Sequence, residues 1–234
     1  MQTILAANTK CCLQAQNSYP NLDVLKRFAN SLKLRMAMHI VKVNPERAKQ
    51  WAEEAVASGV IETEDQEIGF INSVTGGGNP LVEIWNSWSD TRLGAGYEQV
   101  LRAYNHPFLN MLFEKNTRIV NAKEPNNTLE AGTKVCGILA GAHVGQEQGS
   151  TSNPYNGFSQ LNPKAMGSAP LYLMKLSEVC FLRAEGAVRG WNMGGTAKDF
   201  YEKGIREANV IDRTLQHRSL RQKYENAVDN YLTI

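Results

Sequence analysis

Residues 168–210 carry the pattern that most restricts how this chain can fold, because they predict two helices packed against each other. In the first helix, apolar or small residues recur three or four positions apart, which places them on one helical face. They are Leu176, Val179, Cys180, Ala184, Ala187 and Val188. Gly190 and the pair Gly194-Gly195 end this helix, and Thr196 can cap the next one together with Asp199. The stretch therefore predicts an antiparallel helical hairpin.

The second helix of this hairpin supplies a facing apolar stripe, formed by Phe200, Tyr201, Ile205 and Ala208. Small residues stand where the two helices should cross. They are Ala184, Gly186 and Ala187 on one helix and Ala197, Gly204 and Ala208 on the other. Small side chains allow close approach, which is typical of hairpins of the tetratricopeptide type.

Residues 22–58 predict a second hairpin, which we expect to pack beside the first. The stripe of its first helix is Leu25, Phe28, Ala29, Leu32, Met36, Ile40 and Val41. Asn44 and Pro45 are typical of a helix start, and Gly59 is typical of a helix end. The inward residues of the second helix are Ala48, Trp51, Ala52, Ala55 and Val56. We interpret Trp51 as core, and Arg35 as a packing residue in preference to a ligand contact.

Composition narrows the possible functions. The chain has 234 residues, 42% of them hydrophobic, and a formal net charge of +2. This balance argues against nucleic acid as a partner, because phosphate-backbone binding needs a basic stripe. No window approaches the roughly 20 apolar residues that span a bilayer. The four cysteines and four histidines are scattered, so we predict no disulfide framework, no metal site and no cofactor.

Between the hairpins, residues 61–167 predict a long, irregular insertion that contains short strands. Ile68, Phe70 and Ile71 indicate one strand, and residues 93–104 predict a helix that buries Tyr97, Val100 and Leu101. Residues 117–165 show no sustained period. Long loops inside compact domains are uncommon and often functional.

Within the insertion, Trp85, Trp88 and Asp90 are candidate ligand-binding residues. Two tryptophans three positions apart in a polar segment do not form a core pattern. Flat aromatic rings suit the C–H faces of pyranose sugars, and neighbouring carboxylates suit their hydroxyl groups. The alternative is that the rings are buried, as Trp mostly is, and that Asp90 and Arg92 form an ion pair or a helix cap.

Beyond residue 210, one more helix is predicted by the apolar residues Leu215, Leu220, Tyr224, Ala227, Val228 and Tyr231. We therefore predict a mostly α fold, with tetratricopeptide-like helical hairpins and a long irregular insertion. The chain is interpreted as one domain, residues 1–234. Its parts are the hairpin 22–58, the insertion 61–167 and the C-terminal hairpin and helix 168–234.

Two segments carry a resemblance to a known family. Residues 170–185, followed by Gly190 and Trp191, resemble the signature of the SusD/RagB family, with Ser177 and Gly186 replacing alanines that are usual there. Residues 28–38 resemble the core helix of the same family, including its asparagine and arginine. The loop from Tyr155 to Ser159 resembles the one that precedes the terminal hairpin, so the resemblance adds Tyr155 and Asn156 to the candidate ligand residues.

The resemblance implies a non-catalytic protein at the outer-membrane surface that binds oligosaccharide. Such a protein passes glycan to a SusC-like TonB-dependent transporter. Family members are exported and lipid-anchored through an N-terminal cysteine, a role that Cys11 and Cys12 do not fit because residues 8–10 lack the small-residue cleavage pattern. We therefore expect the chain to be a piece of a longer protein. Around His106 the family's Asn-Asp-Pro motif is altered, so a role tied to its charges does not carry over.

Two other functions fit parts of the pattern. The hairpins alone are consistent with a tetratricopeptide-like scaffold that binds a protein partner and no sugar. A glycoside hydrolase needs two carboxylates that flank a cleft. Glu83 and Asp90 lie near the tryptophans, but no arrangement of base and nucleophile is readable, and we predict that the protein is not an enzyme.

Overall fold

The computed structural model describes residues 14–15, 21–70, 84, 88, 91–117, 132–140, 157–162, 170–208 and 218–232. The chain divides into two compact units. Unit 1 comprises Met1–Gly77 and Pro170–Asn209, and unit 2 comprises Gly78–Ala169 and Val210–Ile234. Segments that lie far apart in the sequence therefore build each unit.

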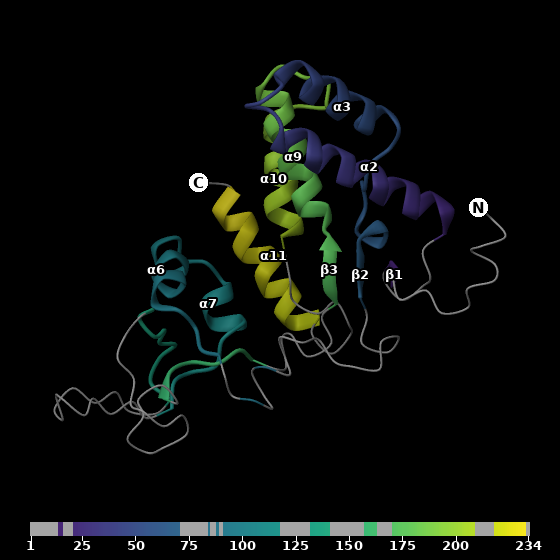
Figure 1. Cartoon of the computed structure of the whole chain (residues 1–234). Coiled ribbons are helices and arrows are strands. Elements are labelled where there is room, and N and C mark those ends of the chain that lie inside the picture. The colour runs from purple at the N-terminus through teal and green to yellow at the C-terminus, as the bar shows by residue number, and fades with distance from the viewer. Residues whose placement is uncertain are drawn as a thin grey trace. The chain divides into compact units, whose positions relative to one another are not determined.

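Both predicted hairpins are present in unit 1 (Figure 1). The first consists of α2 (Leu22–His39) and α3 (Pro45–Ala57), and the second of α9 (Leu176–Val188) and α10 (Ala197–Glu207). The predicted caps are confirmed: Asn44 Oδ1 accepts a hydrogen bond from the Arg47 N–H at 3.0 Å, and Thr196 Oγ1 accepts one from the Asp199 N–H at 3.1 Å. Gly190, just after α9, has a φ of 76°, the left-handed conformation that favours glycine at a helix end.

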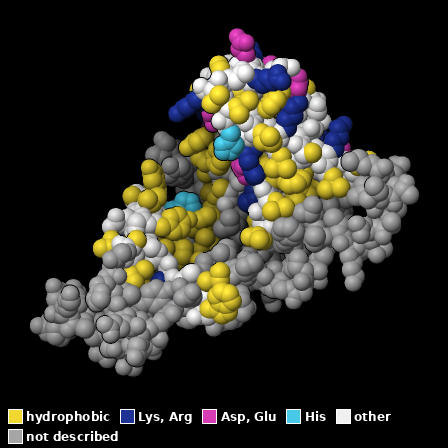
Figure 2. All heavy atoms as spheres, in the orientation of Figure 1, with side chains coloured by type: hydrophobic (Ala, Val, Ile, Leu, Met, Phe, Trp, Pro, Cys, Tyr) yellow, Lys and Arg dark blue, Asp and Glu magenta, His cyan; other side chains and the backbone are white. Residues whose placement is uncertain are grey.

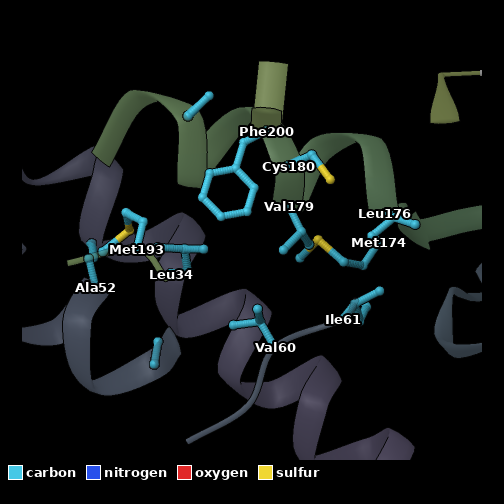
Figure 3. Close-up of a cluster of buried hydrophobic side chains, with 13 residues drawn as sticks. Leu34, Ala52, Val60, Ile61, Met174, Leu176, Val179, Cys180, Met193 and Phe200 are labelled. Carbon is cyan, nitrogen blue, oxygen red and sulfur yellow. The ribbon is translucent and has the colours of Figure 1, made fainter. Parts of the chain in front are cut away.

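One hydrophobic core joins the two hairpins, as predicted. Figure 3 shows side chains of all four helices pointing toward one another, among them Leu34 of α2, Ala52 of α3, Val179 of α9 and Phe200 of α10. Trp51 is half-buried against this core, as expected. A Cβ on Gly186 would lie 2.6 Å from Met193 Sδ and 3.2 Å from Met38 Cε, so the small residue allows close packing between the hairpins.

Three of the apolar stripes predicted for the hairpins are partly wrong. Met36 is 59% exposed, whereas Ser31, Leu34 and Ala37 of the same helix are fully buried. The Ser31 hydroxyl donates to the Arg27 carbonyl and accepts from the Ile61 N–H, so a polar residue occupies the buried face without an unsatisfied group. The predicted stripe of α2 is therefore partly right, because Phe28 and Leu32 pack against the core, but it omitted the buried residues Ser31, Leu34 and Ala37. On the C-terminal hairpin, two residues of the predicted stripes are exposed, Val188 and Tyr201.

A small antiparallel sheet completes unit 1. Its strands β1 (Gln14–Ala15), β2 (Ile68–Phe70) and β3 (Leu171–Met174) lie in the order β1-β2-β3. The register pairs Ile68 with Met174 and Phe70 with Leu171, with an irregularity at Ile68/Gly69. The predicted strand over Ile68 and Phe70 is thus confirmed, and Ile71 lies outside the described residues. In Figure 1, β3 leads directly into α9.

The short 3-10 helix η1 (Glu64–Gln66) is followed by Glu67, which lies at the N-terminus of α9. Glu67 is buried, and its Oε1 accepts a hydrogen bond from the Leu176 N–H at 2.9 Å. Lys175 Nζ lies 3.4 Å from the other carboxylate oxygen. A carboxylate at a helix N-terminus satisfies an N–H that has no partner within the helix.

Unit 2 contains α6 (Ala95–Ala103), α7 (Phe108–Met111) and α11 (Arg218–Leu232). The rings of Phe108 and Tyr224 stack with centroids 5.0 Å apart, which packs α7 against α11. The predicted terminal helix is confirmed, with Tyr224 and Val228 buried. The helix predicted over residues 93–104 is also confirmed, but of its three expected core residues only Leu101 is buried.

The predicted fold class is confirmed, because helices make up most of the regular structure in both units. Within the described ranges, no helix has both the length and the apolar character needed to span a membrane. Figure 2 shows charged side chains over the part of unit 1 that carries α2 and α3. Lys33 of α2 and Glu54 of α3 form one of its ion pairs, at 2.7 Å.

Candidate functional site

Of the five predicted ligand-binding residues, the structure describes Trp88. Its side chain is 63% exposed, so its indole is not part of the core. This exposure leaves a ring face open to solvent, as stacking on a sugar requires. Trp85, Asp90, Tyr155 and Asn156 lie outside the described residues.

The described residues that follow the two candidate segments are hydrogen-bonded to each other. Leu93 comes three positions after Asp90, and Ser159 comes three positions after Asn156. The Leu93 N–H donates to the Ser159 carbonyl at 2.9 Å, and both residues are buried. The fold therefore joins two stretches of chain that are more than sixty residues apart in the sequence.

A third stretch, residues 135–138, lies against both of them. The Ile138 N–H donates to the Leu93 carbonyl at 2.7 Å, which forms part of a parallel bridge between Gly94 and Ile138. The Cys136 N–H donates to Ser159 Oγ, and the Ser159 N–H donates to the Cys136 carbonyl, each at 2.9 Å. We call this arrangement of residues 91–95, 135–138 and 157–160 the three-segment junction.

Glycine is required at position 137 because the backbone of Gly94 and Ala95 lies so close to it. A Cβ at this position would lie 2.8 Å from three backbone atoms, the carbonyl carbon and oxygen of Gly94 and the nitrogen of Ala95. Backbone atoms cannot move aside as a flexible side chain can, so any residue larger than glycine forces the two backbone segments apart.

Two charged side chains of α6 form hydrogen bonds that hold the helix against the junction. Glu98 Oε2 accepts from the Gly137 N–H at 2.6 Å, and Arg102 Nη2 donates to the Val135 carbonyl at 2.7 Å. The two side chains also pair with each other, at 2.7 Å between Arg102 Nε and Glu98 Oε1. Both charges are therefore used in holding the scaffold.

A second set of contacts supports the far side of the junction. The Glu114 N–H donates to the Gln160 carbonyl at 2.9 Å, and the Asn162 N–H donates to the Leu112 carbonyl at 2.7 Å. Asn116 is buried, and its side-chain Oδ1 accepts from the Lys134 N–H at 3.1 Å. Residues 157–162 are thus hydrogen-bonded to the chain just after α7 as well as to Leu93, just before α6.

Arg35 has the structural role that the sequence indicated. Its guanidinium donates to both carboxylate oxygens of Glu178 and to the carbonyl of Leu173, all within unit 1. It therefore ties α2 to the start of α9 and to β3.

The described residues include no group of three or more His, Cys, Asp or Glu that is arranged to hold a metal ion. Cys180 is buried, and burial raises the pKa of its thiol to about 11. A thiol is nucleophilic only as the thiolate, and this raised pKa keeps Cys180 in the thiol form. Cys180 is therefore a core residue and not a nucleophile. Within the described residues, the junction is a hydrogen-bonded backbone scaffold that directly follows the two candidate segments in the sequence.

Comparison with known families now gives the class of the protein. The family model of SusD-like proteins, described as "Susd and RagB outer membrane lipoprotein", matches residues 3–232 of this chain. This match spans nearly the whole chain. The chain therefore belongs to the SusD-like family, as the resemblance at residues 170–185 and 28–38 implied.

Solved structures agree with this assignment. A SusD homologue from Bacteroides ovatus is 32% identical, with a TM-score of 0.69, over 99% of this chain and 44% of its own. A chitin-binding SusD homologue from Flavobacterium johnsoniae is 30% identical, with a TM-score of 0.65, over 100% of this chain and 43% of its own. A SusD homologue from Bacteroides thetaiotaomicron is also 30% identical, with a TM-score of 0.65, over 92% of this chain and 39% of its own.

This chain thus spans about two fifths of the length of the solved structures that it resembles. No match is found among curated proteins.

Proposed function

We propose that the chain forms part of a non-catalytic carbohydrate-binding protein that acts at the outer-membrane surface. The observation that carries this proposal is the family match over residues 3–232. A solved relative of the family, 30% identical over the whole of this chain, is described as chitin-binding. Oligosaccharide is therefore the ligand class that the relationship favours.

The proposed binding residues are Trp85, Trp88, Asp90, Tyr155 and Asn156. The exposure of Trp88 supports this assignment, since an indole that is 63% exposed has a face available for a pyranose ring. The hydrogen bond between Leu93 and Ser159 supports it further, because it joins the backbone that follows both candidate segments. Loops that carry binding groups on a rigid scaffold are a common arrangement for ligand sites.

The same relationship supports the cellular setting. The family is described as an outer membrane lipoprotein, and a surface lipoprotein of this kind would pass glycan to a SusC-like TonB-dependent transporter. Lipid anchoring, surface exposure and this transfer are parts of the proposal.

The test is titration calorimetry of the chain with a panel of oligosaccharides that includes chitin fragments, cellulose fragments and malto-oligosaccharides. Trp88→Ala should weaken binding of the preferred glycan by about tenfold or more, which corresponds to about 1.4 kcal/mol. Tyr201→Ala is the matched control, because Tyr201 is a similarly exposed aromatic residue in unit 1. It should leave affinity unchanged.

If the folded chain binds no glycan in the panel, the carbohydrate proposal fails. If the double variant W85A/W88A binds glycan as well as the parent does, the site assignment fails while the function stands. If the chain binds a protein partner but no glycan, the result favours the scaffold alternative.

A further inference from the structure

Helix α6 and its C-terminal cap residue, Tyr104, carry an apolar stripe that faces solvent. Tyr97, Val100 and Tyr104 are 49%, 52% and 62% exposed. Their spacing of three and four residues places them on one face of the helix. The sequence pattern assigned Tyr97 and Val100 to the core, and the structure leaves both at the surface. Figure 2 shows hydrophobic side chains, in yellow, on the part of unit 2 that carries α6.

The two tyrosines have a defined separation. Seven residues of α-helix rise about 10 Å, so the Cα atoms of Tyr97 and Tyr104 are separated by roughly two helical turns along one face. The Tyr97 ring is held in place by the edge of Phe113, with centroids 6.2 Å apart and planes at 76°. A ring that is already ordered loses little conformational freedom when a ligand stacks on it.

The surroundings of the stripe favour an uncharged ligand. The charged residues of α6 are Glu98 and Arg102, and they bind each other and backbone groups of residues 135–137. Neither charge is therefore directed toward a ligand on the tyrosine face. Burial raises the pKa of the Tyr97 hydroxyl above its ordinary value, so it remains a neutral hydrogen-bond donor.

The size of the stripe argues against a stable protein interface. Such interfaces bury about 800 Å² on each partner and involve roughly 20–30 residues a side. Three side chains, on α6 and at its C-terminal cap, fall far below this. A narrow, uncharged, aromatic strip is the kind of surface on which pyranose C–H faces stack.

We propose that Tyr97 and Tyr104 are an additional binding strip for an extended, uncharged β-1,4-linked glycan. This inference rests on the proposed carbohydrate-binding function and specifies its ligand class. In such a glycan each ring is turned over relative to the last, so alternate rings present the same face. The separation of the two tyrosines is about the length of two ring units, which lets each one stack on an alternate sugar with Val100 beneath the ring between them.

An α-1,4-linked glycan does not fit the same strip. Its chain curves into a helix, so alternate rings do not remain on one straight line against a rigid rod such as α6. The strip therefore selects by linkage geometry. It also selects by length, because a disaccharide cannot reach both tyrosines.

The experiment measures affinity of the chain for chitohexaose, chitobiose and maltohexaose by calorimetry. Tyr97→Ala and Tyr104→Ala should each weaken binding of chitohexaose by about fivefold, which corresponds to about 1 kcal/mol. Affinity for chitobiose and maltohexaose should be unchanged. Tyr97→Phe and Tyr104→Phe keep the rings and should stay within about twofold of the parent, and thermal unfolding checks that every variant is folded. Tyr201→Ala is the control for an exposed tyrosine elsewhere.

The outcomes separate this inference from the function on which it rests. If the parent binds chitohexaose and both alanine variants bind it equally well, the strip does not bind glycan, but the proposed function stands. Equal losses for hexamer and dimer would also overturn the two-ring strip. If the alanine variants keep the glycan affinity of the parent but change its sedimentation, the stripe serves self-association and the inference is overturned. If the parent binds no glycan at all, the proposed function itself fails.

Discussion

Arg35 of α2 and Glu178 of α9 form a two-pronged ion pair, with Nε and Nη2 of the arginine 2.5 and 2.7 Å from the two carboxylate oxygens. The residues are 143 positions apart, so this pair connects the two hairpins of unit 1. Both side chains are partly exposed, at 30% and 39%, which lets water screen part of the interaction. The planar match between guanidinium and carboxylate still makes it stronger than a typical surface pair.

Replacing Arg35 with methionine should destabilise unit 1. Methionine keeps most of the length of the side chain but removes the hydrogen bonds to Glu178 and Leu173. We expect the free energy of unfolding to fall by about 1–2 kcal/mol, measured by urea denaturation. Lys33→Met, which breaks the more exposed pair with Glu54, should cost about 0.5 kcal/mol or less. Equal costs for the two variants would contradict the special role of Arg35.

Replacing Glu67 with alanine should have a larger effect than the Arg35 variant. The change removes the acceptor of the Leu176 N–H and leaves the ammonium of Lys175 near a buried, empty position. Loss of one partner from a buried pair typically costs about 3 kcal/mol, and we expect a decrease of about 2–4 kcal/mol in urea denaturation. Asp65→Ala changes an exposed carboxylate of η1 and should be nearly neutral. A Glu67→Ala variant as stable as the parent would show that α9 does not need this cap.

Gly137 and Gly96 should respond in opposite ways to substitution by alanine. A Cβ on Gly137 would meet backbone atoms at 2.8 Å, so the variant should lose about 2 kcal/mol or more and weaken glycan binding through the displaced junction. A Cβ on Gly96, within α6, meets nothing within 4 Å, so alanine should add about 0.5 kcal/mol by reducing the freedom of the unfolded chain. Thermal unfolding of both variants is the measurement. A stabilised Gly137→Ala would rule out the tight junction.

Unit 2 should lose stability in mild acid because of His106. Its Nδ1 accepts a hydrogen bond from the Phe108 N–H, and its ring packs against the rings of Phe108 and Tyr224. Burial lowers the pKa of this histidine below its ordinary value of 6.5. The unfolded chain therefore binds the proton more readily, and stability that is present above pH 6.5 is lost as pH falls through the lower, folded pKa.

Urea denaturation at pH 7.5 and pH 5.0 measures this effect. His106→Asn keeps an acceptor oxygen near the position of Nδ1 without a titrating ring, so it should reduce the difference between the two pH values. His39→Asn, a change at an exposed histidine, is the control. An unchanged pH dependence in His106→Asn would assign the acid sensitivity to other groups.

The secondary structure of unit 1 was predictable because its signals are local. Asn44, Pro45, Gly59, Gly190 and Thr196 each act on the few residues beside them, and the structure places the helix ends there. The phase of α2 was less predictable, because Ser31 is buried by hydrogen bonds to Arg27 and Ile61 that hydropathy does not register. On α6, a regular apolar stripe faces solvent although the same spacing in α9 faces the core.

The candidate site was predictable only in its residue types. The pair of tryptophans in a polar segment indicated exposed rings, and the exposure of Trp88 agrees with that indication. The hydrogen bond between Leu93 and Ser159 had no counterpart in the sequence pattern, since it joins two backbone groups.

The sequence by itself determined the hairpins, their caps and the family to which the chain belongs. These depend on periodic spacing and on short motifs, which act over a few residues and can be read without knowing the fold. Only the tertiary structure decided which face of each helix is buried, which carboxylate caps α9 and which segments meet at the three-segment junction. Those contacts join residues far apart in the chain, and backbone hydrogen bonds and steric closeness leave no periodic pattern in the sequence.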